Sequence, residues 1–373
     1  MTDVQVGHPP IEYGMVADGH PELFDIRAMP SPNKDKKPGQ LPNDMIRQFF
    51  ENGYVIVKDF FSSSELDPCR KAIEDQIEIL ARKLFKAGKI KDLYSKHGFF
   101  ERLTIIERDF PGANIVLHKY PAISQAFKDL WTNERLLNVI EQLIGPEIAG
   151  HPLWNLRTKI PQNEATTVPW HQDSAYLDNK SYKVLQPTAW IPLLDSTVEN
   201  GCMQVMHGGH RAGKIAAHRR HGDSFYIVVD EEEMEKSLGA NLDKDIVTCE
   251  VPYGGMLLLN NIIPHRSLPN ISGDIRWSLD LRWQKPDQPF GFYGLKQGVL
   301  MRTAKDPNFK MSWEAFERLG SRQLLRDVTI GDTDQVEDEF DTHVKGPWIK
   351  KWENVHMNRH VESNRDDSMA DKS

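Results

Sequence analysis

The first half of the chain carries hydrophobic residues at three- and four-residue steps, the spacing that places side chains on one face of a helix. The longest such stretch begins at a cap within Ser62–Ser64 and runs to about Ala87, where Gly88 ends it. Its predicted buried stripe consists of Leu66, Ile73, Ile77, Leu80, Leu84 and Phe85. Shorter helices are predicted from an Asn43 cap to Gly53, over Ile123–Trp131 and over Glu134–Ile144, with a strand at Tyr54–Val57.

After about residue 150 the pattern changes to short apolar or alternating runs, which predict strands. The runs are Leu153–Ile160, Thr188–Leu193, Met203–Val205, Ile246–Val251, Met256–Ile263 and Ile275–Trp283. Turn signals such as Asn200-Gly201 and Gly254-Gly255 separate them. Helices followed by short strands predict an α+β domain whose second half is a β-sandwich or barrel.

The two ends of the chain depart from these patterns. Residues 1–40 are rich in proline, glycine and charge, and a poorly ordered lead-in is expected there. One domain is expected over residues 41–300, helical over 41–150 and strand-rich over 151–290. An extension of helix and loop over 301–360 is expected to pack on that core through Trp313, Trp348 and Trp352, before a flexible tail over 361–373. The acidic run Asp230–Glu235 is interpreted as a solvated surface segment.

Composition and charge narrow the class of protein. Hydrophobic residues make up 39% and charged residues 27% of the 373, as in an ordinary globular protein. A net charge of −8 without a basic stripe argues against nucleic-acid binding. No apolar run of about 18 residues predicts a membrane span. Cys69, Cys202 and Cys249 form no CxxC pair, and we find no secretory or peroxisomal signal, so a cytoplasmic location is expected. The oligomeric state is not predicted.

Candidate chemistry begins at Pro169-Trp170-His171-Gln172-Asp173. Alternate side chains of an extended chain share a face, so His171 and Asp173 point the same way. With a second imidazole from a distant strand they would complete a 2-His-1-carboxylate triad, which leaves open positions on a non-haem iron. By itself the HxD tripeptide is more typical of a structural His–Asp pair.

A second segment supplies that imidazole. The run from Gly254 to Ile263 predicts a buried central strand, and His265 follows at its far end. The mouth of a barrel is expected at this position. The alternative is a histidine that is satisfied within the core.

A third segment, Arg276–Trp283, alternates without a break. Arg276, Ser278, Asp280 and Arg282 share one face, and Trp277, Leu279, Leu281 and Trp283 share the other. Arg276 follows His265 by eleven residues, across a short turn, which places it near the proposed metal site if its face points inward. Its planar fork suits a terminal carboxylate, and Ser278 could donate one more hydrogen bond. The alternative is a half-buried strand whose polar face meets water.

Taken together, these segments resemble the phytanoyl-CoA dioxygenase (PhyH-like) family of Fe(II)/2-oxoglutarate-dependent oxygenases. The motifs that carry the resemblance lie between about residues 42 and 290: FFENGYVIVKDFFSSSEL, WHQD, ENGCMQVMHGGHR and the PHRS…RWS pair. The resemblance implies a double-stranded β-helix, or jelly roll. It implies iron ligation by His171, Asp173 and His265, with Arg276 binding 2-oxoglutarate. Secondary cofactor contacts are expected from Asn155, Lys159, Gln172, Trp190, Ser267 and Ser278.

The substrate is less well defined. Trp170, Tyr176, Arg282 and His207 are the expected substrate contacts. His207 stands where the family usually has a proline, so a structural and a substrate-facing role both stay open. Arg282 could bind an anionic group or form an ion pair with Asp280 or another acid, and Trp283 is expected in the core. His210 and His218 are interpreted as turn or surface residues rather than ligands.

The implied reaction is hydroxylation of a C–H bond in a small molecule, with Fe(II), O2 and 2-oxoglutarate, which is decarboxylated to succinate and CO2. Ascorbate is expected to support activity. Because related halogenases lack the carboxylate, Asp173 favours hydroxylation over halogenation, whereas desaturation and ring formation stay open. Two rival hypotheses are a zinc-dependent hydrolase or isomerase and a non-catalytic small-molecule-binding jelly roll. The hydrolase hypothesis gives Arg276 no role, and an intact triad argues against the binding jelly roll.

Overall fold

The structure of the protein is a computed structural model. It describes residues 19–32, 35–119, 123–222, 224, 226–294, 296–317, 340–342, 348 and 351–352. The expected flexible tail over 361–373 lies outside the described residues, as do residues 1–18. No described helix is long and apolar enough to cross a membrane.

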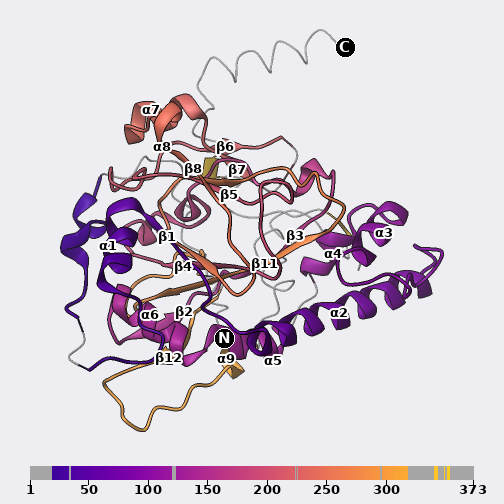
Figure 1. Cartoon of the computed structure of the whole chain (residues 1–373), viewed down its shortest axis with the longest axis horizontal. Coiled ribbons are helices and arrows are strands. Elements are labelled where there is room, and N and C mark those ends of the chain that lie inside the picture. The colour runs from indigo at the N-terminus through magenta and orange to yellow at the C-terminus, as the bar shows by residue number, and fades with distance from the viewer. Residues whose placement is uncertain are drawn as a thin grey trace, which may run out of the picture.

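Helices dominate the N-terminal part and strands the remainder (Figure 1). The helices are α1 (Asn43–Asn52), α2 (Ser63–Lys86), α3 (Arg102–Asp109), α4 (Ala113–Lys119), α5 (Gln125–Trp131), α6 (Glu134–Ile144), α7 (Glu231–Leu238), α8 (Leu242–Asp245) and α9 (Glu314–Glu317). The 3-10 turns are η1 (Pro21–Leu23), η2 (Ile26–Ala28), η3 (Glu164–Thr166), η4 (Asp173–Tyr176) and η5 (Asn179–Ser181).

The strands are β1 (Tyr54–Val57), β2 (Ile148–Gly150), β3 (Asn155–Lys159), β4 (Thr188–Pro192), β5 (Met203–Met206), β6 (Arg219–Arg220), β7 (Ile227–Val228), β8 (Ile246–Cys249), β9 (Met256–Leu259), β10 (His265–Ser267), β11 (Arg276–Gln284) and β12 (Val299–Arg302). A seven-stranded sheet runs in the order β1-β9-β4-β11-β2-β12, with β3 also paired to β11. A three-stranded sheet, β10-β5-β8, forms a second layer. These strands pair in antiparallel fashion throughout the described residues. The α+β jelly-roll prediction is confirmed.

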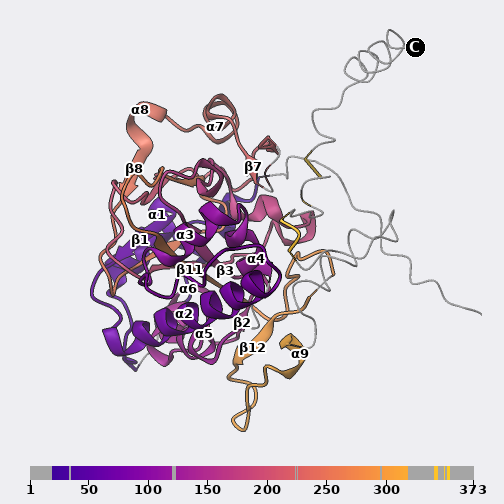
Figure 2. The same cartoon turned by 90° about the vertical axis from the view of Figure 1, so that its right-hand side faces the viewer.

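The predicted helix boundaries rest on recognisable end signals. Gly53 ends α1 with a φ of 85°, which a residue without Cβ adopts at little cost. Ser62 and Glu65 form a reciprocal capping box at the start of α2. Five of the six predicted stripe residues of α2 are buried, but Phe85 is 48% exposed, so the stripe ends one residue earlier than expected. In Figures 1 and 2, α2 lies along one side of the fold, with α5 beside it.

The alternation of β11 separates two environments. Trp277, Leu279, Leu281 and Trp283 pack in the main core, together with residues from the N-terminal helices. Arg276, Ser278, Asp280 and Arg282 lie on the other face, and they are buried too. The expectation for Trp283 is confirmed, and the alternative of a water-facing polar strand is excluded. The polar side chains of β11 therefore line the interior.

His265 does not lie at the end of the strand that precedes it in sequence, as predicted, but belongs to another strand. The strand β9 ends at Leu259, and His265 begins β10 in the three-stranded sheet. The intervening residues cannot continue β9, because the side chain of Asn260 accepts from the backbone of Ile262 and Asn261 bonds to Ser174 and Val184. The histidine is thus carried by the second sheet, opposite β11.

Segments outside the predicted domain pack closely where they are described. In the expected lead-in, Phe24 is 1% exposed between η1 and η2, so this part is more regular than predicted. In the extension, Trp352 is fully buried and donates from Nε1 to the Ala175 carbonyl at 2.9 Å. The acidic run forms the start of α7, with exposed glutamates and a buried Met234. The domain boundaries themselves stay a prediction.

Candidate metal centre and cofactor pocket

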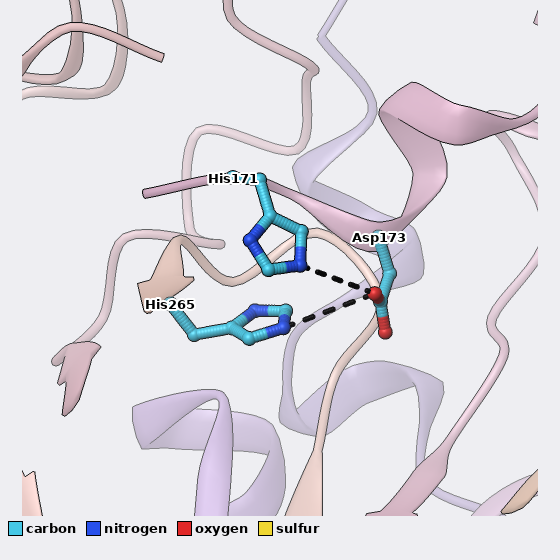
Figure 3. Close-up of side chains that lie close together, drawn as sticks. All are labelled: His171, Asp173 and His265. Carbon is cyan, nitrogen blue, oxygen red and sulfur yellow. Dashed lines mark ion pairs between the residues drawn. The ribbon is translucent and has the colours of Figure 1, made fainter. Parts of the chain in front are cut away.

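Three side chains from two separate segments meet inside the jelly roll. Asp173 Oδ1 lies 3.6 Å from His171 Nε2 and 3.8 Å from His265 Nε2 (Figure 3). His171 and His265 form an isolated antiparallel bridge, with backbone bonds of 3.0 and 2.9 Å, so the two segments are held in register. Asp173 follows as the first residue of η4. The three ligand atoms lie within 4.8 Å of one another.

Both imidazoles are oriented by their other nitrogen. His171 Nδ1 lies 2.8 Å from the Pro169 carbonyl, and His265 Nδ1 lies 3.0 Å from the Ile263 carbonyl. A carbonyl only accepts, so each Nδ1 carries the proton and each Nε2 presents a lone pair to the site. Burial, and then the neighbouring His171, lowers the pKa of His265 to about 4, which keeps that ring neutral.

Asp173 is held as a carboxylate by an arginine. Burial opposes its ionisation, but Arg282 and the two histidines outweigh burial and keep the pKa of this carboxyl well below its usual range. Arg282 Nη2 donates to Asp173 Oδ2 at 2.9 Å, which leaves Oδ1 facing the histidines. Two imidazole nitrogens and one carboxylate oxygen form a donor set that suits non-haem Fe(II), so the residues present fit that metal.

A cavity of about 210 Å³ opens beside these three residues. Its walls include predicted cofactor residues from both sheets: Lys159, Trp190, Ser267 and Arg276. The register explains their proximity, because Arg276 pairs with Lys159 across β11 and β3, while Asp280 pairs with Trp190 across β11 and β4. Cross-strand partners in an antiparallel sheet place their side chains on the same face.

Arg276 is a buried cation that forms no ion pair with the described residues, although Asp280 on the same face of β11 attracts it at longer range. It is 3% exposed, and Nη1 donates to Ser278 Oγ at 2.9 Å. Its guanidinium carbon lies 5.0 Å from the ring centroid of Trp190. Its buried Nε has no hydrogen-bond partner. Burial lowers the pKa of Arg276 only to about 10, so it stays charged at neutral pH. A buried charge without a direct ion pair is costly, which points to an anionic ligand.

Lys159 lies next to this arginine. Its Nζ donates to Ser267 Oγ at 2.9 Å, and the Thr166 carbonyl lies at 3.2 Å. Burial, with the charges of Arg276 and Arg157, lowers the pKa of Lys159 to about 6. The lysine is therefore mostly neutral at pH 7 until an anion binds nearby.

Several expected contacts fall elsewhere. The amide of Gln172 is engaged by the backbones of Lys214, Ala216 and Ile262, so its assignment as a cofactor contact is corrected to a structural one. Asn155 bonds to Asp280 at 3.4 Å and lies outside the described cavity lining. Ser278 accepts from Arg276 and thereby orients the arginine; a direct bond from Ser278 to 2-oxoglutarate stays a prediction.

The expected substrate contacts are also revised. Trp170 packs under Arg266, 4.7 Å from its guanidinium carbon, and donates to Glu231, while the ring of His207 packs against Tyr54. Neither Trp170 nor His207 is among the described residues that line the cavity, so the structure does not support their assignment as substrate contacts. Tyr176 packs edge-on against His171 with centroids 5.6 Å apart, behind the metal ligand. Arg282 lines the cavity but forms an ion pair with Asp173. This agrees with the alternative role predicted for Arg282, an ion pair with an acid of the protein.

His210 and His218 were expected to be turn or surface residues; both are buried, so a surface position is wrong, but the turn position of His210 is confirmed. His210 lies in a turn, and its Nε2 bonds to the Phe50 carbonyl at 2.7 Å. His218 accepts from the Gln172 backbone at 3.1 Å. Both rings serve the packing around the loops rather than the three-residue centre.

Sequence reasoning missed other residues that line the cavity. They are Glu107, Asn114, Ile115 and His118 from α3 and α4, Tyr226 next to β7, and Arg157 with Asp280. The parity of β3 could have found Arg157, because it shares a face with Lys159. No local signal marks α4 as a cavity wall, since that contact joins segments far apart in the chain.

The chain is similar to proteins of known family. A family model described as phytanoyl-CoA dioxygenase (PhyH) matches residues 49–278. The chain belongs to the phytanoyl-CoA dioxygenase (PhyH) family. It is therefore an iron- and 2-oxoglutarate-dependent dioxygenase, and the family resemblance seen in the motifs is confirmed.

Individual PhyH relatives are distant in sequence. A phytanoyl-CoA dioxygenase domain-containing protein 1 homolog from Dictyostelium discoideum is 23% identical over 66% of this chain and 92% of its own length. A 1-deoxypentalenic acid 11-beta-hydroxylase from Streptomyces arenae is 27% identical over 48% of this chain and 67% of its own length. Among solved structures, EctD from S. alaskensis with 2-oxoglutarate and 5-hydroxyectoine is 17% identical, with a TM-score of 0.49 over 84% of this chain and 94% of its own.

Proposed function

We propose that this PhyH protein hydroxylates a C–H bond of a small-molecule substrate and converts 2-oxoglutarate to succinate and CO2. His171, Asp173 and His265 would hold Fe(II), and Arg276 would bind the distal carboxylate of 2-oxoglutarate. The observation that carries the proposal is the buried Arg276 guanidinium, whose Nε has no hydrogen-bond partner, in the same cavity as the three-residue centre. The hydrolase hypothesis gives this arginine no role, and the three-residue centre argues against a simple binding protein.

Each residue of the cavity has a definite role in the proposed reaction. When bound, Fe(II) with 2-oxoglutarate and O2 supplies the oxidising power for C–H cleavage. Arg282 keeps Asp173 ionised and in one orientation through Oδ2. Ser278 orients Arg276, and Lys159 and Ser267 offer further hydrogen bonds to an anion. The apolar walls formed by Trp190, Met203 and Leu259 limit the water around the reacting groups.

The test is anaerobic loading with Fe(II), followed by addition of O2, 2-oxoglutarate and ascorbate. Succinate should form in proportion to the 2-oxoglutarate consumed, slowly without substrate and faster with a substrate from a small-molecule panel. Tight retention of zinc together with no succinate across the panel would instead favour the hydrolase or isomerase hypothesis.

Binding of 2-oxoglutarate should take up a proton at Lys159. Because the pKa of Lys159 in the free protein is about 6, the lysine is charged below that pH and neutral above it. A bound carboxylate stabilises the charged form, so the affinity for 2-oxoglutarate should be highest below about pH 6 and fall as the pH rises. Calorimetry of the Ni(II)-loaded protein in buffers of different ionisation enthalpy measures both effects.

Lys159→Met should remove this pH dependence, and the surface substitution Lys71→Met should leave it unchanged. An affinity that is flat between pH 5 and 8 in the wild type would show that Lys159 does not contact the co-substrate.

The proposal also covers the cellular location of the protein and the size of its substrate. We propose a cytoplasmic location, which is supported by three cysteines that are all free thiols in the described structure. Substrate is expected to be a small molecule, in keeping with a cavity of about 210 Å³.

A further inference from the structure

We infer that Arg157, held in place by Asp280, is a specificity-determining residue that binds a carboxylate on the substrate. The substrate class is thus a small organic acid. This inference rests on the proposed function, because it assumes that 2-oxoglutarate occupies the Arg276 end of the cavity.

The charged groups of the cavity can be assigned one by one. Four basic side chains line it, Arg157, Lys159, Arg276 and Arg282, against three acidic ones, Glu107, Asp173 and Asp280. Arg282 is bound to Asp173. Glu107 accepts from the backbone N–H groups of Gly112 and Asn114 at 2.8 Å. Since Lys159 is mostly neutral at pH 7 until an anion binds, the remaining cations are Arg157 and Arg276, and Asp280 attracts both of them.

Arg276 and Lys159 form one neighbouring pair and are the expected partners of 2-oxoglutarate. That leaves the guanidinium of Arg157 for a different anion. Its one acidic neighbour among the described residues is Asp280, whose Oδ2 accepts from Arg157 Nε at 2.8 Å. The other oxygen, Asp280 Oδ1, is buried without a partner. The pair thus combines a fixed donor with an unused acceptor, as a recognition site for a polar group requires.

The position of the pair fits a substrate rather than the co-substrate. The Arg157 side chain is 23% exposed and that of Asp280 only 6%, so the guanidinium lies toward solvent and the carboxylate lies deeper. Asp280 lies 4.0 Å from Arg282, which bonds to Asp173. Three successive ion pairs, Arg157–Asp280, Asp280–Arg282 and Arg282–Asp173, therefore connect Arg157 to the metal-binding carboxylate. A small molecule held at Arg157 can present a C–H bond to the metal centre.

Neighbouring groups complete a polar end of the cavity. Asn114 and His118, one turn apart on α4, line the same cavity. The Asn114 Oδ1 atom is buried without a partner and can accept a hydrogen bond from a hydroxyl. Tyr226 lies beside Arg157. Arg282, the earlier candidate for an anionic group, is bound to the metal-binding carboxylate of Asp173, whereas the acid that pairs with Arg157 is not a metal ligand, so the recognition of a substrate acid is assigned to Arg157.

The test uses wild-type protein loaded with Ni(II) and saturated with 2-oxoglutarate, so that Arg276 is already occupied. Benzoate and decanoate are titrated by calorimetry against their uncharged counterparts, benzamide and decanamide. The wild type should bind the carboxylates about tenfold or more tightly than the amides, because a charge-assisted hydrogen bond is lost with the amide.

Arg157→Gln should abolish the preference, whereas Arg157→Lys should keep part of it because the charge stays. Since Arg157→Gln leaves Asp280 buried without its partner, the double variant R157Q/D280N provides a neutral version of the pair that tests the same point. The exposed Arg27→Gln is the matched control and should behave as the wild type.

The outcomes are separable. If the wild type fails to bind 2-oxoglutarate with metal present, the proposed function is wrong. If it binds 2-oxoglutarate but shows no preference for carboxylates, or if R157Q/D280N keeps the preference, only the inference about Arg157 is overturned. A marked loss of 2-oxoglutarate affinity in R157Q/D280N would also overturn it, since Arg157 would then belong to the co-substrate site.

Discussion

His265→Ala should reduce the affinity for Fe(II) by about a hundredfold or more, and succinate formation should fall below detection. Loss of an outer partner of a metal ligand already costs about 10–100-fold, so loss of a ligand should cost at least as much. The remaining pair, His171 and Asp173, comes from a single short segment and offers two donors instead of three. Titration of Ni(II) under anaerobic conditions, together with metal analysis after Fe(II) loading, measures the loss.

The fold should survive this substitution. Asp173 keeps its ion pair with Arg282 at 2.9 Å, so no buried carboxylate is left unpaired. The thermal midpoint of metal-free His265→Ala should therefore stay close to that of the metal-free wild type. His97→Ala, at a partly exposed histidine that pairs with Glu101, serves as the control. Normal iron binding in His265→Ala would mean that the centre lies elsewhere.

Arg276→Ala should weaken 2-oxoglutarate binding by roughly a hundredfold and leave metal affinity within a few-fold of the wild type. Each charge-assisted hydrogen bond contributes about 1.5–3 kcal/mol, and a guanidinium can offer two to one carboxylate. Arg276→Lys should recover only part of the affinity, since an ammonium group cannot reproduce the planar fork. Binding is measured by calorimetry with Ni(II), and turnover by succinate formation at rising 2-oxoglutarate concentration.

The same variant also tests the cost of the unpaired charge. Removing a buried cation that forms no direct ion pair with the described residues should make the ligand-free protein no less stable, and more stable if cavity formation costs less than the buried charge. Arg219→Ala, at an exposed arginine paired with Asp230, is the control. Unchanged 2-oxoglutarate affinity in Arg276→Ala would contradict both the anchor assignment and the proposed function of the cavity.

Local sequence signals account for much of the fold. The Ser62–Glu65 capping box and Gly53 mark helix ends through contacts within a few residues, so their positions could be predicted. The strict alternation of Arg276–Trp283 assigned its two faces for the same reason. Short elements such as β6, β7 and α4 were missed, because they owe their conformation to distant partners rather than to their own propensity.

In the candidate site, too, some features could be predicted from sequence and others depend on the tertiary structure. Spacing and parity, joined with the family motifs, determined from sequence that His171, Asp173, His265 and Arg276 belong to one centre. Only the tertiary structure decided that His265 lies on the second sheet, that Arg282 is bound to Asp173, and that Arg157 with Asp280 faces the same cavity. The physical reason is that a side chain's direction along a strand is a local property, whereas its ion-pair partner depends on which segments the fold brings together. Gln172, His210 and His218 have the same side-chain chemistry as ligands, and their backbone hydrogen bonds show them to be structural.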